Sequence, residues 1–66
     1  DQSRYDGRFL RIADVAAETS LSRATIYRLI KKGQFPSAIQ VSTQRVAWHE
    51  RAVREWMSQK IETFSS

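Results

Sequence analysis

The sequence contains no cysteine, which excludes disulfide bonds, cysteine-ligated zinc sites and thiol nucleophiles. It also lacks any apolar run near the roughly 20 residues of a membrane-spanning helix, and no signal peptide is visible. A chain of 66 residues fits one small domain. We therefore expect a cytoplasmic protein with a single small core and no role at a membrane.

Patterns for catalysis are absent as well. There is no glycine-rich phosphate loop, no pair of inward-facing carboxylates and no nucleophile beside a general base at a known spacing. The single histidine, His49, has neither a cysteine nor a second histidine with which to share a metal, and we interpret it as a helix-start residue. The sequence thus predicts a protein that is not an enzyme and holds no metal or cofactor.

Acidic residues are missing from the middle of the chain. The net charge is +4 and the pI is near 10.1, which points to an acidic partner. No Asp or Glu lies between Thr19 and His49, whereas that window carries five basic residues: Arg23, Arg28, Lys31, Lys32 and Arg45. A solvated helix face normally mixes both signs. The window therefore favours a surface that binds a polyanion. The alternative is that a chain this short lacks acidic residues there by chance.

Two short helices are predicted around the start of this window. A helix over residues 12–18 is predicted because side chains of one face recur at helical spacing: Ile12, Val15, Ala16 and Thr19. The three residues that follow this helix allow only a tight turn. Ser22 is a good N-cap for a second helix over residues 23–32, and Gly33 and Pro36 are typical of a helix end.

A β-hairpin is predicted next, because apolar and polar residues alternate there in two runs. A turn at Thr43-Gln44 would put the apolar side chains of both strands on one face through these cross-strand pairs: Val41 with Val46, and Ile39 with Trp48.

A third helix is predicted over residues 50–60, with this apolar stripe: Val53, Trp56, Met57 and Ile61. Because Trp48 and Trp56 lie on apolar stripes, we expect both to pack in the core. Residues 1–7 lack apolar periodicity and are predicted to form a flexible tail. Residues 8–62 form the predicted domain, and residues 63–66 a C-terminal tail.

The first two helices and their tight turn have the pattern of a helix-turn-helix. If the apolar side of the second helix faces inward, its outward face suits a DNA major groove: Arg23, Ala24, Thr25, Tyr27, Arg28 and Lys31. Backbone amides at Ser22 suit a phosphate, and Arg45 at the hairpin tip could reach the adjacent backbone or minor groove. Tyr27 is equally suited to lie across the junction of helix and hairpin. Lys32 and Arg11 are interpreted as solvated charges.

The run RFLRIADVAAETSLSRATIYRLIKKGQFPSAIQV, followed by RVAWHERAVREWM, resembles the AlpA-type prophage regulators, which are relatives of the phage excisionases and of MerR-like winged helix-turn-helix domains. The resemblance covers about residues 8–60. It implies a mainly α fold, a winged helix-turn-helix with three helices and a hairpin wing between the second and third. It also implies a small DNA-binding transcriptional regulator, often of phage integrase or excision genes. Ser20 departs from the glycine usual at that point of the turn.

Carried over residue by residue, the resemblance implies a recognition helix at about residues 22–32 and a wing at about residues 39–48. The DNA-binding positions would be Ser22, Arg23, Ala24, Thr25, Tyr27, Arg28 and Lys31, with Thr43, Gln44 and Arg45 in the wing. The expected partner is double-stranded DNA in the nucleoid, with pairing of two copies as a homodimer or on adjacent sites.

Two alternatives stay open. The first is an excisionase-like architectural factor, which bends DNA for site-specific recombination and contacts a recombinase. The second is a protein-interaction module without DNA binding, which docks on an acidic surface of RNA polymerase or of a recombinase.

Overall fold

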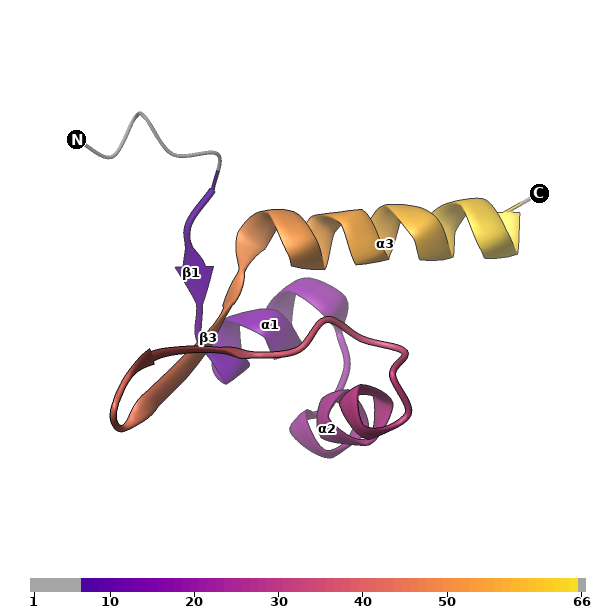
Figure 1. The fold of residues 1–66 in the computed structure, drawn as a ribbon. Helices are drawn as coiled ribbons and strands as arrows, with labels where there is room; N and C mark the ends of the chain where they lie inside the picture. The colour runs from indigo at the N-terminus through magenta and orange to yellow at the C-terminus, as the bar shows by residue number, and fades with distance from the viewer. Residues whose placement is uncertain (1–6, 66) are drawn as a thin grey trace.

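The computed structural model describes residues 7–65, which form three helices and a small antiparallel sheet (Figure 1). The elements follow one another as β1 (Phe9–Leu10), α1 (Ile12–Thr19), α2 (Arg23–Lys31), β2 (Ile39–Ser42), β3 (Arg45–His49) and α3 (Glu50–Ser65). The predicted fold class, a winged helix-turn-helix, is confirmed. Most of the predicted N-terminal tail, residues 1–6, lies outside the described residues.

The turn between α1 and α2 depends on one residue in the left-handed region. Ser20 has φ 63° and ψ 20°, and its backbone N–H donates to the Ala16 carbonyl at 2.8 Å. The hydroxyl of Thr19 donates to the Val15 carbonyl at 2.8 Å and accepts from the Leu21 N–H at 3.3 Å. Serine at this position therefore adopts a left-handed conformation that L-residues rarely adopt and that glycine adopts without steric cost.

Both ends of α2 are capped by the residues from which these ends were predicted. The hydroxyl of Ser22 accepts the backbone N–H of Thr25 at 3.1 Å, which satisfies one of the free amides of the first turn. At the other end Gly33 has φ 72°. Its N–H donates to the Ile30 carbonyl at 3.0 Å, and the N–H of Gln34 donates to the Leu29 carbonyl at 2.8 Å. These two bonds define a Schellman motif.

The sheet has three strands in the order β1-β3-β2, and both pairings are antiparallel. β1 pairs with β3, so that Phe9 lies opposite His49 and Leu10 opposite Trp48. No pattern in the sequence predicted the pairing of Phe9 and Leu10 with β3. Because Leu10 and Trp48 are both fully buried, this third strand contributes directly to the core.

The hairpin turns where it was predicted to turn, but its register differs. The observed pairs are Ser42 with Arg45, Gln40 with Val46 and Ile39 with Ala47. The predicted pairs of Val41 with Val46 and Ile39 with Trp48 are wrong, because the register shifts between Gln40 and Ser42. One residue of β2 is therefore extra, as in a β-bulge. As a result Ile39, Val41 and Val46 each stay roughly half exposed, and they do not share a buried face.

The core lies where α1, α2, β3 and α3 meet, and its buried side chains are Leu10, Val15, Ile26, Phe35, Trp48 and Val53. The expectation of core packing is confirmed for Trp48, which is fully buried, whereas Trp56 is partly buried and packs against the core. The Trp48 indole N–H donates to the Pro36 carbonyl at 3.0 Å, and that of Trp56 donates to the Gln34 carbonyl at 2.7 Å. Phe35, between these two acceptors, packs edge-on against Trp56 with ring centroids 4.7 Å apart. These contacts fix the segment that leaves α2.

The α3 helix starts at Glu50 as predicted but continues to Ser65, past the expected end at Lys60 and through most of the predicted tail. No glycine or proline follows Pro36 in the sequence, so nothing interrupts the helix. Its last turns extend beyond α1 and α2 (Figure 1). Ile61, expected on the apolar stripe, is 64% exposed, because the core does not reach that far. Within residues 7–65, none of the helices has the length and apolar character of a membrane span.

Candidate nucleic-acid interface

The α2 helix separates an apolar rear from an exposed basic face. Ile26 is fully buried, and Leu29 and Ile30 are half-buried against the core. The opposite side carries the exposed residues Arg23, Ala24, Tyr27, Arg28 and Lys31, with Thr25 half-buried. We call these six residues the α2 face. The predicted orientation of the helix is therefore confirmed, whereas contact with DNA stays a prediction.

The beginning of α2 is held by two of the predicted contact residues. Besides accepting the backbone N–H of Thr25, the Ser22 hydroxyl donates to the Thr25 hydroxyl at 2.9 Å. Both side chains therefore order the first turn. Ser22 is exposed, so the same turn lies at the surface where a ligand could meet its backbone amides.

The hairpin tip provides the second exposed basic element. Thr43, Gln44 and Arg45 are all exposed. The Gln40 side-chain amide donates to the Thr43 carbonyl at 3.4 Å, a long hydrogen bond across the turn. The three residues of the wing that were predicted to contact DNA thus lie together, between the end of β2 and the start of β3.

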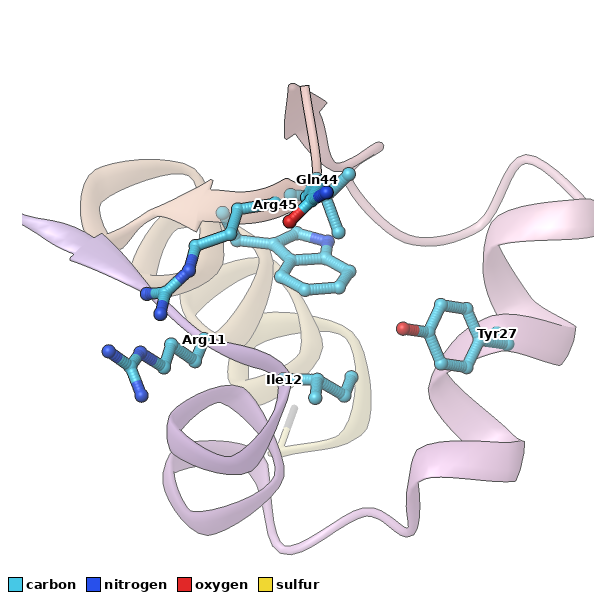
Figure 2. Close-up of a pocket in the computed structure, with 7 residues that line it drawn as sticks. Arg11, Ile12, Tyr27, Gln44 and Arg45 are labelled. Atoms are coloured by element: carbon cyan, nitrogen blue, oxygen red, sulfur yellow. The ribbon is translucent and has the colours of Figure 1, made fainter. Parts of the chain in front are cut away.

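Tyr27 connects the α2 face to the hairpin. The residue is 47% exposed, and its ring lies 6.3 Å from the Trp48 ring between centroids, tilted by 60°. Figure 2 shows its hydroxyl pointing into a groove between α2 and the hairpin. Tyr27 thus lies at the junction of helix and hairpin, while its predicted contact with DNA stays a prediction.

Arg11 is a member of this groove that the sequence did not reveal. A groove of about 220 Å³ is lined by Arg11 and Ile12 from the start of α1, by Tyr27, and by residues of the hairpin that include Arg45 (Figure 2). Arg11 was interpreted as a solvated charge. Because Arg11 and Arg45 lie far apart in the chain, only the tertiary structure could bring them together.

The charges of the two basic elements are not paired with acidic groups of the described residues. Within residues 7–65, none of Arg23, Arg28, Lys31 or Arg45 forms a salt bridge. The ion pairs lie instead around Glu50, with Arg54 at 3.1 Å and Arg8 at 3.9 Å. The mixed-sign surface of α3 is therefore separate from the cationic surface formed by α2 and the hairpin.

Metal-binding groups are not clustered in the part of the chain that the structure describes. No three His, Cys, Asp or Glu side chains of residues 7–65 come together as a metal site would require. The predicted helix-start role of His49 agrees with its contact there: its Nδ1 accepts the backbone N–H of Arg51 at 3.1 Å, beside the beginning of α3.

Comparison with known proteins identifies relatives of phage origin. The family model described as "Prophage CP4-57 regulatory protein (AlpA)" matches residues 8–61 of the chain. A protein of Enterobacteria phage P4, described as "Uncharacterized protein ORF88", is 44% identical over 54 residues. That alignment covers 82% of the present chain but 61% of the phage protein, so the chain spans only part of the length of this relative.

Proposed function

The chain belongs to the family of the prophage CP4-57 regulatory protein AlpA, and on this premise we propose that it binds double-stranded DNA sequence-specifically as a small transcriptional regulator of phage type. In this proposal α2 enters the major groove with the residues of the α2 face and Ser22. The hairpin tip, with Thr43, Gln44 and Arg45, contacts the adjacent backbone or minor groove. The protein would act in the cytoplasm, on DNA of the nucleoid.

The observation that carries the proposal is the basic α2 face, whose cations form no salt bridge with the residues that the structure describes. Arg23, Arg28 and Lys31 are exposed on one helix whose rear is anchored by the buried Ile26. An anchored rear keeps the helix rigid, so the cations need little ordering when a ligand binds. Arginine forks match guanine edges and phosphates, and a small residue such as Ala24 permits close approach to the groove. Phosphate contacts would position the helix, whereas only base contacts would select a sequence.

The test is the salt dependence of duplex binding. About three to five phosphate contacts per protomer predict a slope of log K against log salt of roughly −3 to −4.5. We would measure this slope by fluorescence anisotropy with labelled random duplex, and then select bound sequences from a random duplex pool. Enrichment of one sequence is the expected result. Affinity for duplex DNA that does not change with salt would contradict the proposal.

The open edge of the sheet favours a second candidate function. β2 pairs with β3 on one side only among the described strands, and all four of its residues are exposed, including Ile39 and Val41. An exposed apolar edge strand is a surface on which another protein can add a strand. This edge suits a partner bound beside the protein on DNA, such as a recombinase, RNA polymerase or a second copy on an adjacent site.

Three assays separate the regulator from the alternative roles. A regulator of transcription should change expression from a promoter that contains the selected sequence, whereas an excisionase-like architectural factor should instead stimulate excision between attachment sites. A protein-interaction module without DNA binding should show no gel shift with random duplex at low salt. The absence of that shift would exclude both DNA-binding roles.

A further inference from the structure

The groove between α2 and the hairpin has an apolar floor and a cationic rim. Ile12, Val46 and Trp48 provide the apolar lining, and Tyr27 bounds one side. Arg11 and Arg45 line the same groove, and Figure 2 shows both guanidinium groups extended on the side away from Tyr27. The groove therefore combines an apolar part with a separate part that carries two positive charges.

The two guanidinium groups have no acidic partner among the described residues. Asp14, the acid nearest to Arg11 in the sequence, accepts the backbone N–H of Arg11 at 3.1 Å and so caps α1. Neither Arg11 nor Arg45 forms a salt bridge within residues 7–65, where the ion pairs involve Glu50. Two like charges beside one groove repel each other, and an anion between them would replace that repulsion with attraction. Guanidinium forks match phosphate oxygens especially well.

We propose that this groove holds one sugar–phosphate unit of the DNA backbone, with the phosphate between Arg11 and Arg45 and the deoxyribose against Tyr27 and Val46. This inference rests on the proposed function, because it places the groove between the two elements that would contact DNA. It adds Arg11, from the beginning of α1, as a residue that positions the protein on the duplex.

The size of the groove favours this ligand over a small effector molecule. Pockets for small molecules usually enclose roughly 300–1,000 Å³, whereas this groove encloses about 220 Å³. A single sugar–phosphate unit uses both kinds of lining, because its sugar is partly apolar and its phosphate is anionic. A contact of this kind carries no sequence information, but it fixes the register of α2 and the hairpin on the duplex.

The first test compares Arg11→Gln with Arg54→Gln by anisotropy on random duplex over a range of salt concentrations. Both variants remove one positive charge, but Arg54 lies on α3 and pairs with Glu50. Loss of one phosphate contact should make the slope of log K against log salt less steep by about 0.9. We expect that change for Arg11→Gln and no change for Arg54→Gln. Arg11→Lys should keep the slope but bind more weakly, because lysine lacks the fork.

The second test locates the phosphate. In a duplex that carries the selected sequence, single phosphates are replaced one at a time by neutral methylphosphonates. One replacement should weaken binding of the unaltered protein but have no further effect on Arg11→Gln, and the same replacement should have no further effect on Arg45→Gln. If the two variants lose sensitivity at different, separated phosphates, the shared site is wrong.

The outcomes distinguish this inference from the proposed function. If the unaltered protein does not bind duplex DNA, both fail together. If it binds and Arg28→Ala weakens binding, while Arg11→Gln behaves like Arg54→Gln, only the groove assignment fails. The melting midpoint of Arg11→Gln should equal that of the unaltered protein, because the backbone of Arg11, and not its side chain, takes part in the α1 cap.

Discussion

Replacing Ser20 with glycine should stabilise the protein, which is unusual for a single substitution. Ser20 adopts φ 63° and ψ 20° in the turn between α1 and α2. Its side chain is exposed, and the hydrogen bond that it makes to Ala16 uses the backbone N–H, which glycine retains. The substitution therefore removes the steric cost of the left-handed conformation without removing a contact.

The expected magnitude is the difference between two opposing terms. The left-handed conformation costs an L-residue with a Cβ roughly 1–2 kcal/mol. Glycine loses more backbone entropy on folding, which costs about 0.5–1 kcal/mol relative to alanine. The net gain should be about 0.5–1 kcal/mol in the free energy of unfolding. In a domain of this size that corresponds to a rise in Tm of about 2–8 °C.

Thermal melting followed by circular dichroism measures the effect, with two variants as controls. Ser20→Val places a β-branched side chain in the left-handed region, where it is strongly disfavoured, and should lower Tm. Ser58→Gly makes the same serine-to-glycine change at an exposed position inside α3, where lower helix propensity should cost about 0.5 kcal/mol. If Ser20→Gly lowered Tm as Ser58→Gly does, the assigned strain in the turn would not exist.

Four further substitutions test how α2 and the segment that leaves it are held. Gly33→Ala should lower the free energy of unfolding by about 0.5–1 kcal/mol, because φ strain costs about 1–2 kcal/mol and the smaller backbone entropy loss of alanine offsets about 0.5–1 kcal/mol of it. The added Cβ would meet no atom within 4 Å, and no change in Tm would contradict this. Ser22→Ala should cost about 1 kcal/mol by removing the acceptor for the Thr25 N–H, and Ser22→Asp should retain most of the stability in urea unfolding. Trp48→Phe should cost about 1–3 kcal/mol by leaving the Pro36 carbonyl unpaired, and hydrogen exchange should become faster around that residue.

The ends of α2 could be predicted because their signals are local. A serine N-cap, a C-terminal glycine and the following proline act within one turn of the helix, so the sequence alone locates them. The exposed face of α2 could also be predicted, because apolar residues at helical spacing occupy one side of the helix and leave the other side for the basic residues. The start of α3 was predicted correctly from Glu50, whose charge suits a helix N-terminus, and the position of the hairpin turn from the apolar alternation on either side of it.

The hairpin register and the groove depend on tertiary packing and could not be predicted in that way. Apolar alternation favoured one buried face for four side chains, but the core behind β3 is occupied by Leu10 and Trp48. The two-residue β1 strand is too short to show a period. Arg11 joins Arg45 only after α1 and the hairpin have packed, so no pattern within the sequence relates them.

The most direct test of the account is to measure duplex affinity and thermal stability together for Arg28→Ala. The side chain is exposed on α2 without a salt bridge among the described residues, so the free energy of unfolding should change by no more than about 0.5 kcal/mol and Tm should stay nearly constant. Binding to the selected duplex should weaken by about 1–3 kcal/mol. A marked fall in Tm with unchanged affinity would mean that Arg28 supports the fold instead of meeting DNA.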